Sequence, residues 1–455
     1  MSVGVGDSTA MMAEAVASAP VAPAGRERAA VAFADTIGVM LAGAQEPAAQ
    51  MAQAMAAEEG AGAGPCRVLG TAIRTSPQLA AFANGVAAHA LDYDDMCFVS
   101  LAHPSCVLVP TALAAGELAP TPVSVLLDAY VVGFELECRL GMVMNPRHYH
   151  QRGWHCTSSI GTLGAAAAAA RVLGLDAART RHALGIAAST ACGLKENLGS
   201  MVKPLHAGLA ARNGLMAARL AQRGFTASAH ALDGPQGYLA AMDSEGLSLE
   251  TAFADLGTRW EILETGVTVK LYPSCAATHP PLDALIDLQR RSGFTAADVE
   301  AIDVEVDSMT PRLLIHPAPT SGLEAKFSMP FCAAAALVYG RLDLATFDVD
   351  HIRNPAVQAL MPRVTLRGNA AFDAAAPLSQ ARVTVRLTDG RAFVQAADGA
   401  RGYPGRLTDD ELASKFIACA TGLLTATGAA AAWSALRDLG SMANVRDLLA
   451  LVSVP

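Results

Sequence analysis

The stretch Ile302-Asp303-Val304-Glu305-Val306-Asp307 alternates apolar and acidic residues without a break. Successive side chains of a β-strand point to opposite faces of a sheet, so this alternation predicts a strand with one buried face. Residues 381–387 alternate in the same way. They are followed by the turn signal Thr388-Asp389-Gly390-Arg391 and by a predicted returning strand at 392–396. Residues 363–367 form a weaker strand candidate.

Helical patterns lie between these strands, at residues 278–291, 323–339 and 349–361. Strands and helices mixed in this way are typical of an α+β domain. We therefore predict a small α+β domain over residues 265–403.

The chain on both sides of this domain is rich in alanine, which favours helix. Apolar residues recur at helical spacing, with Gly, Pro or Asn at the breaks. The predicted helical segments before residue 260 are 27–43, 77–91, 107–118, 122–141, 158–173, 177–193 and 206–223. Residues 407–452 return to helix. The expected fold is mainly α, with a large all-helical domain built from both chain ends (1–264 and 404–455) and a smaller inserted α+β lid domain (265–403).

The composition limits the classes of partner. Among 455 residues, 42 are acidic and 33 are Lys or Arg, which gives a net charge of −9. A chain without a basic stripe is not expected to bind nucleic acid. An anionic small molecule is not excluded, because it responds to the local field of its pocket. No run of 18 or more bulky apolar residues is present, so no membrane span is expected.

The cysteines and the start of the chain indicate a cytoplasmic protein. The nine cysteines contain no Cys-x-x-Cys pair, which is typical of reduced thiols. Residues 1–10 lack a basic start followed by an apolar block, so no secretion signal is predicted.

Four islands of polar residues interrupt a chain in which only 16% of residues are charged. The first is Met201-Val202-Lys203-Pro204-Leu205-His206-Ala207-Gly208, between two alanine-rich segments. Lysine is seldom buried unless it is paired or functional, so Lys203 is a candidate site residue. Burial would lower its pKa, and a substrate carboxylate would raise it.

The second island runs from Leu91-Asp92-Tyr93-Asp94-Asp95 to His103-Pro104-Ser105. Its acids either form a solvated loop that caps the next helix or include a carboxylate that orients a histidine. Pro104 predicts a helix start, which places His103 at a helix entrance.

The third island, Gly153-Trp154-His155-Cys156-Thr157, precedes another predicted helix. Its N-terminus can receive a carboxylate, although ordinary capping explains the same residues. Nothing favours Cys156 as a nucleophile over a buried thiol.

The fourth island is Val269-Lys270-Leu271-Tyr272-Pro273-Ser274-Cys275, at the start of the α+β domain. Two lysines and two histidines can bind carboxylates and move a proton between a carbon and a base. The histidines and Cys275 lack a tight ligand spacing, so no metal is expected. No Gly-x-Ser-x-Gly elbow is present to indicate a serine hydrolase.

In order and spacing, these islands closely resemble the MmgE/PrpD family, over residues 10–450. The matching strings are Leu91-Asp92-Tyr93-Asp94-Asp95, His103-Pro104-Ser105, Lys203-Pro204-Leu205-His206-Ala207-Gly208, Tyr272-Pro273-Ser274-Cys275 with Thr278-His279, and Glu324-Ala325-Lys326-Phe327-Ser328. The family includes methylcitrate dehydratase, cis-aconitate decarboxylase and iminodisuccinate epimerase.

The resemblance implies a homodimeric enzyme that needs no cofactor and takes a small polycarboxylate as substrate. The implied catalytic residues are Asp92, His103, His155, Lys203 and Lys270. We expect Lys203 and Lys270 also to bind the substrate, together with His206, Ser274 and Met96.

The sequence leads us to expect a lyase of the dehydratase type that removes a proton next to a carboxylate of a di- or tricarboxylic acid. Asp92 would orient one histidine. The alternatives are an epimerase of a dicarboxylate such as iminodisuccinate, a decarboxylase of a cis-aconitate-like acid, and a carboxylate-binding homologue without activity. Two departures bear on this choice. By the resemblance, Met96 stands where family members often have threonine, and Leu313 stands where the decarboxylases have a tyrosine.

Overall fold

The computed structural model describes residues 7–60, 64–375 and 379–453. Contacts between Cα atoms divide the chain into two compact units. We call Met1–Ala90, Asp94–Val267 and Asp409–Pro455 the helical unit, and Leu91–Tyr93 with Thr268–Thr408 the sheet unit. Each unit is described by itself.

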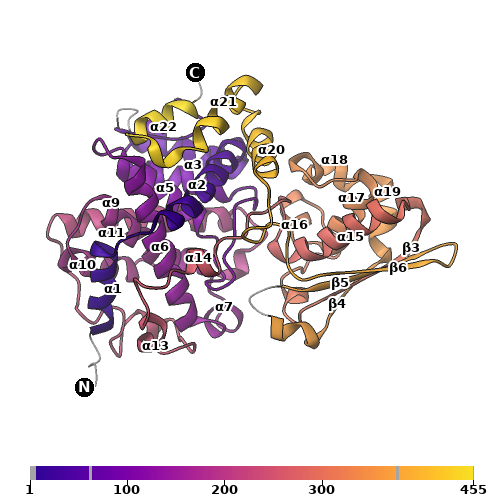
Figure 1. Ribbon diagram of the computed structural model, residues 1–455, viewed down its shortest axis with the longest axis horizontal. Helices are drawn as coiled ribbons and strands as arrows, with labels where there is room; N and C mark the ends of the chain where they lie inside the picture. The colour runs from indigo at the N-terminus through magenta and orange to yellow at the C-terminus, as the bar shows by residue number, and fades with distance from the viewer. Residues whose placement is uncertain (1–6, 61–63, 376–378, 454–455) are drawn as a thin grey trace. The chain divides into compact units, whose positions relative to one another are not determined.

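The helical unit is built from the alanine-rich segments, as predicted (Figure 1). Its longer helices before residue 268 are α1 (Asp7–Ser18), α2 (Pro23–Gly43), α3 (Pro47–Gly60), α4 (Pro77–His89), α5 (Ser105–Gly116), α6 (Val123–Met144), α9 (Gly161–Val172), α10 (Ala177–Ala188) and α11 (Val202–Gln222). The shorter helices before residue 268 are α7 (Arg147–His150), α8 (Cys156–Ser159), α12 (Tyr238–Ala241), α13 (Leu249–Phe253) and α14 (Glu261–Glu264). The C-terminal part adds α20 (Asp409–Ala420), α21 (Ala426–Leu436) and α22 (Val445–Leu451).

The prediction that this part of the chain is entirely helical is wrong at one place. β1 (Cys66–Arg67) and β2 (Arg74–Thr75) form a small antiparallel sheet within it. The strands are two residues long, too short for an alternating pattern to be visible in the sequence.

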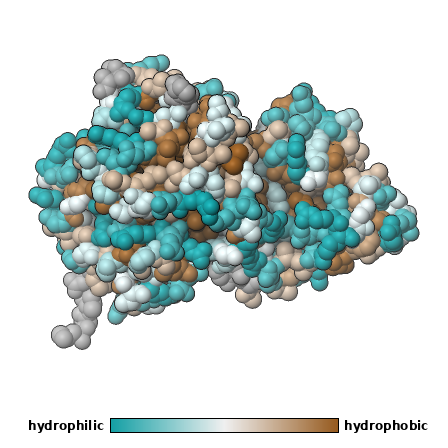
Figure 2. All heavy atoms as spheres, turned by 45° about the horizontal axis from the view of Figure 1, so that its top comes forward, coloured by the Kyte–Doolittle hydropathy of each residue, from teal (hydrophilic) through white to brown (hydrophobic). Residues whose placement is uncertain are grey.

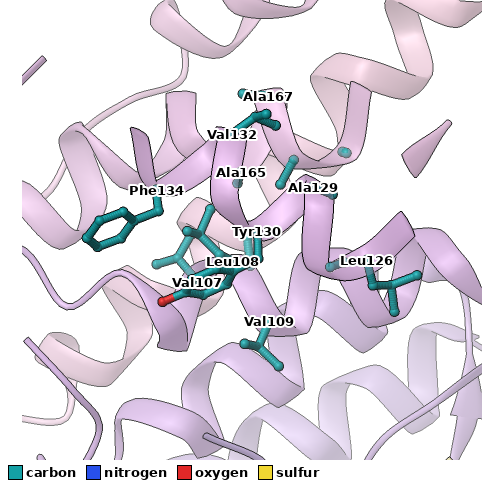
Figure 3. Close-up of a cluster of buried hydrophobic side chains, with 14 of the residues drawn as sticks. Val107, Leu108, Val109, Leu126, Ala129, Tyr130, Val132, Phe134, Ala165 and Ala167 are labelled. Carbon is teal, nitrogen blue, oxygen red and sulfur yellow. The ribbon is translucent and has the colours of Figure 1, made fainter. Parts of the chain in front are cut away.

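Small side chains let the central helices pack closely. Figure 3 shows part of this core, in which Val107, Leu108 and Val109 of α5 lie with Tyr130 of α6 and Ala165 of α9. The residues of α9 from Gly161 to Ala170 are all buried. A helix that is apolar or small on every side belongs inside a bundle, as the sequence of this segment predicts.

The sheet unit contains a four-stranded sheet of order β4-β3-β5-β6. Its strands are β3 (Val299–Val306), β4 (Val364–Gly368), β5 (Ala381–Leu387) and β6 (Ala392–Ala397). β4 pairs parallel to β3, and β3, β5 and β6 pair antiparallel. All four predicted strands are therefore confirmed.

The alternation of β3 and β5 separates the two faces of this sheet. Val304 and Val383 are paired and fully buried. On the other face Arg382 lies 2.6 Å from Glu305, and Arg386 lies 2.6 Å from Asp303. Helices α15 (His279–Ser292) and α17 (Met329–Tyr339) pack on the sheet (Figure 1).

Two of the predicted helices in the sheet unit are interrupted. The segment 323–339 divides into α16 (Gly322–Ala325) and α17, and the segment 349–361 divides into α18 (Val349–Ile352) and α19 (Pro355–Leu360). Pro330 and Pro355 lie in the first turns of α17 and α19. A proline disfavours helix for the residue before it, which explains why a new helix starts at each.

The face of the molecule seen in Figure 2 has a mixed surface. Figure 2 shows hydrophilic and hydrophobic residues interspersed over the face in view. The exposed large apolar side chains include Met51, Phe225, Ile315 and Val394. Within the described ranges, no helix is both long enough and apolar enough to cross a membrane. Residues 1–6, on which part of the signal-peptide expectation falls, lie outside the described residues.

Candidate active site

The helical unit gathers polar side chains from three of the four islands, and His89, into its interior. The chain segments that supply them are the end of α4, the loop after it, the entrances of α5 and α8, and the first turns of α11. The side chains are His89, Asp94, His103, His155, Lys203 and His206. All are buried except His103, which is partly exposed. Buried groups of this kind are costly unless they are paired.

Close contact between α4 and α11 brings His89 and Lys203 together. A Cβ atom added to Gly208 would lie 2.6 Å from the carbonyl oxygen of Phe82. Only a residue without a side chain fits there, so the glycine of the Lys-Pro-x-His-x-Gly string allows the two backbones to approach. Pro204 lies in the first turn of α11, where it disrupts no helical hydrogen bond.

A chain of short contacts runs from Lys203 to His103. Nζ of Lys203 lies 3.0 Å from Nε2 of His89, and Nδ1 of His89 lies 2.7 Å from Oδ2 of Asp94. Nδ1 of His103 lies 3.2 Å from the same carboxylate oxygen. The rings of His89 and His103 meet edge to face, with centroids 4.6 Å apart.

His155 and His206 form a second pair, with 3.0 Å between their Nδ1 atoms. The N–H of His155 donates to the carbonyl oxygen of Gly193, and Trp154 pairs with Leu194, so a short β-like bridge positions this histidine. Burial and the charge of Lys203 hold the pKa of His155 well below its usual range. Burial, with His89 and Lys203, lowers the pKa of His206 to about 4. Both histidines are therefore neutral near pH 7.

Two adjacent acids have pKa values that are shifted in opposite directions. Burial acts to raise the pKa of Asp94, but attraction to His89 and His103 lowers it well below the ordinary value. Burial raises the pKa of Asp95 well above its ordinary value, against the hydrogen bonds from Ser105. Asp94 is consequently a carboxylate, whereas burial disfavours the charged form of Asp95, which accepts hydrogen bonds from Ser105; the Ser105 hydroxyl also contacts Tyr130.

Asp92, Lys270 and Ser274 lie in the sheet unit. Nζ of Lys270, which is fully buried, lies 2.6 Å from Oδ1 of Asp92 and 2.8 Å from its carbonyl oxygen. Asp92 has a φ of 53°, in the left-handed region. The hydroxyl groups of Ser274 and Thr278 are 2.8 Å apart.

The sheet unit holds a second buried lysine near the segment Leu91–Tyr93. Nζ of Lys326 donates to the carbonyl oxygens of Leu91, at 2.6 Å, and Pro273, at 2.9 Å. Lys326 thus binds the carbonyl oxygen of Leu91, and Lys270 binds the carbonyl and carboxylate oxygens of Asp92.

The remaining predicted positions are less distinctive. Met96 is partly exposed in the helical unit. Leu313 follows a short 3-10 helix, Thr310–Arg312, and is partly exposed. Cys156 is buried, and burial raises the pKa of its thiol to about 12, so it is protonated at neutral pH.

Sequence reasoning did not single out His89 or Lys326. His89 is the last residue of α4, where a histidine is common for reasons of helix capping. The sequence nevertheless contained a signal, because His89 ends an apolar helix and three acidic residues follow it within six positions. Lys326 stood in a matching string but was given no role.

Comparisons with known proteins agree with the order of the islands. Residues 7–249 match the MmgE/PrpD N-terminal domain, and residues 272–439 match the MmgE/PrpD C-terminal domain. A cis-aconitate decarboxylase-like protein of Aspergillus oryzae is 30% identical over 449 residues, which cover 94% of this chain and 92% of the relative.

Two further relatives are named as cis-aconitate decarboxylases. The Homo sapiens protein is 30% identical over 387 residues, which cover 83% of this chain and 78% of the relative. The Aspergillus terreus protein is 27% identical over 454 residues, which cover 94% of this chain and 92% of the relative.

Proposed function

Since this chain belongs to the MmgE/PrpD family, we propose that it is a lyase that acts on a small polycarboxylic acid by moving a proton at a carbon next to a carboxylate. The observation that carries the proposal is the group of one lysine, one ionised aspartate and four histidines in the helical unit, all buried except the partly exposed His103. A cation can bind a substrate carboxylate there, and an imidazole can exchange a proton with carbon.

Decarboxylation of an unsaturated tricarboxylate such as cis-aconitate is the first candidate reaction. Three relatives named for this activity or likened to it align with most of the chain. In this reaction the bond between carbon and the departing carboxylate breaks, and carbon dioxide leaves. The electron pair shifts through the double bond to the carbon beside a second carboxylate. This carbon then takes up a proton from the protein.

His103 is the best placed proton donor or acceptor in the helical unit. The negative charge of Asp94, 3.2 Å away, stabilises an imidazolium at this position. His155 and His206, in contrast, are kept neutral by burial and by Lys203. Lys203 would bind a carboxylate and stabilise the negative charge that spreads onto it during the reaction. The proposed roles of Asp92, Lys270, Ser274 and Met96 rest on the family resemblance.

Dehydration is the second candidate, and Leu313 favours it. An aliphatic side chain cannot replace a tyrosine hydroxyl as a proton donor, so the position aligned with the decarboxylases' tyrosine lacks this chemistry. Removal of a proton next to a carboxylate followed by loss of hydroxide would use the same histidine and lysine.

Proton NMR in heavy water separates these reactions. The purified protein is incubated with cis-aconitate, methylcitrate, citrate and iminodisuccinate in separate samples. We expect new methylene alkene signals from cis-aconitate, with deuterium at the saturated carbon next to a carboxylate. A new alkene from methylcitrate or citrate would instead establish dehydration. Deuterium exchange without a new product would favour an epimerase. No change with any of these acids would contradict the proposal.

A further inference from the structure

We propose that Asp94 and His89 are positioning residues: Asp94 fixes the proton of His103 on Nδ1, and His89 links this carboxylate to the ammonium group of Lys203. The inference rests on the proposed function, because it assigns His103 and Lys203 to the reaction. It goes beyond the function by naming two residues that act through others.

The contacts of Asp94 determine where the protons on the two histidines lie. A carboxylate only accepts hydrogen bonds, and Oδ2 of Asp94 lies 2.7 Å from Nδ1 of His89 and 3.2 Å from Nδ1 of His103. A hydrogen on Nδ1 is therefore favoured in both rings, because His89 lies at hydrogen-bonding distance from the carboxylate and His103 lies at ion-pair distance from it. When the rings are neutral, the lone pair of each lies on Nε2.

The tautomer of His89 accounts for its contact with Lys203. With its Nδ1–H donated to Asp94, His89 can only accept at Nε2, and Nζ of Lys203 lies 3.0 Å from that atom. The order Lys203, His89, Asp94 therefore forms one continuous path of donors and acceptors. A cation at one end and an anion at the other hold the intervening imidazole in a single orientation.

The same tautomer makes His103 suitable for proton transfer. Its Nε2 is the nitrogen that exchanges the proton, and the carboxylate at Nδ1 compensates the positive charge of the imidazolium. A carboxylate that orients a histidine in this way is a known device of general acid–base catalysis. Sequence reasoning gave this role to Asp92, whereas the carboxylate beside His103 within the helical unit belongs to Asp94.

The other ionisable groups around Asp94 in the helical unit do not replace this arrangement. Burial raises the pKa values of Asp95 and Cys106 well above their ordinary values, which disfavours the charged form of both groups. Asp35 is paired with Lys415 at 2.7 Å. His155, whose ring centroid lies 5.9 Å from that of His89, and His206 are neutral.

The first test is a direct observation of the tautomers without substrate. The chain contains eleven histidines, a number that ¹⁵N-histidine NMR can resolve with single His→Gln variants for assignment. At neutral pH we expect His89 and His103 to be the Nδ1–H tautomer in the wild-type protein. In Asp94→Asn the His103 signals should shift towards the Nε2–H tautomer. An Nε2–H tautomer of His103 in the wild-type protein would overturn the proposal whether or not the protein turns over a substrate.

The second test compares the pH dependence of turnover in Asp94→Asn and the wild-type protein. We expect kcat to fall by a factor on the order of 10²–10⁴, with KM changed by less than about threefold. Loss of the carboxylate destabilises the imidazolium of His103. The limb of the kcat profile that reports this group should therefore move to lower pH by about one to three units, whichever way the proton travels.

Glu135→Gln is the matched control. Glu135 is a buried acid of the same unit, and its Oε1 lies 2.7 Å from Nε of Arg139. The variant should lose stability and keep the wild-type pH profile. If Asp94→Asn behaves like this control, the aspartate is merely structural and the proposal is wrong.

His89→Gln tests the other half of the path. Glutamine can still contact Lys203 but cannot join it to Asp94 in the same geometry, so Lys203 loses its fixed position. We expect KM to rise about tenfold, with a smaller change in kcat. Unchanged KM, kcat and pH profile would overturn the assignment of His89.

If no polycarboxylate is turned over but the tautomers are as expected, the proposed function fails and the role of Asp94 in fixing the tautomer stands.

Discussion

At the scale of single residues, neighbouring ionisable groups of the helical unit have pKa values that are shifted in opposite directions. Asp94 and Asp95 are neighbours in the chain, yet the pKa of Asp94 lies well below its ordinary value and that of Asp95 lies well above it. The difference arises because Asp94 faces two histidines whereas Asp95 faces the hydroxyl group of Ser105. Neutral His155 and His206 beside Lys203 add no positive charge that would repel its ammonium group.

Replacement of Lys203 tests the central cation. Lys203→Ala should reduce kcat/KM by at least about a thousandfold, because both a carboxylate ligand and a charge that stabilises the transition state are lost. Lys203→Arg keeps the charge but misplaces it, and should recover only part of the activity. Steady-state kinetics with the substrate identified by NMR would measure both effects. Circular dichroism should show an intact fold, and near-normal activity of Lys203→Ala would refute the assignment.

At the scale of elements, the active-site geometry depends on the packing of α4 against α11. The sequence predicted a helix that starts at residue 206, whereas α11 starts at Val202. Pro204 is acceptable there because the first turn needs no backbone donor. Lys203 and His206 therefore lie one turn apart on a rigid helix instead of in a loop, with orientations that are set by the helix.

Gly208→Ala tests this packing. The added Cβ would lie 2.6 Å from the carbonyl oxygen of Phe82, an atom of the backbone that cannot move cheaply. We expect a loss of about 1–3 kcal/mol in the free energy of unfolding and a fall in activity, because α11 and Lys203 must shift. Urea denaturation and kinetics would measure the two effects.

Gly25→Ala in α2 is the control for the same substitution in a helix. The nearest atom to its added Cβ, in Val21, lies 3.4 Å away, which is an ordinary contact. This variant should be as stable as the wild-type protein or slightly more stable, because alanine favours helix. Equal stability of the two variants would contradict the importance of the close helix contact.

At the scale of the whole molecule, buried neutral histidines make stability sensitive to acid. Burial lowers the pKa values of His148 and His206 to about 4 and holds that of His155 well below its usual range. In the unfolded chain these histidines bind protons with the ordinary histidine pKa of about 6.5. Stability due to these residues is therefore complete above pH 6.5 and is lost as the pH falls from about 6.5 towards 4.

The expected slope is at most about 1.4 kcal/mol per pH unit for each of these histidines. Urea denaturation between pH 7.5 and 4.5 would measure it. His148→Gln is a useful comparison, since His148 contacts Ser159 at 2.7 Å and lies outside the group around Lys203. This variant should show a shallower slope. Buried acids with raised pKa values, such as Glu135, contribute a slope of the opposite sign, so the comparison between His148→Gln and the wild-type protein decides. Equal slopes for the two proteins would contradict the assignment of a neutral buried His148.

The amino-acid sequence by itself determined the elements and the chemistry available to them. Alanine-rich segments predicted the long helices, strict alternation predicted β3 and β5, and the turn signal after β5 predicted β6, because these patterns are local. The islands also identified Lys203, Lys270 and three of the four histidines of the group in the helical unit, since polar residues stand out in an apolar chain. Short strands such as β1 and β2, and helices divided at prolines, were not predicted because their signals extend over too few residues.

Only the tertiary structure decided which charges meet. Lys203 contacts His89 across 114 positions of sequence, and Lys270 contacts Asp92 across 178. The string of residues 91–95 contains three carboxylates, and nothing in its local pattern distinguishes Asp92, Asp94 and Asp95. Their roles are set by burial and by contacts that exist only when distant segments pack, because an ionised carboxylate is stable in the interior only beside a positive charge or hydrogen-bond donors.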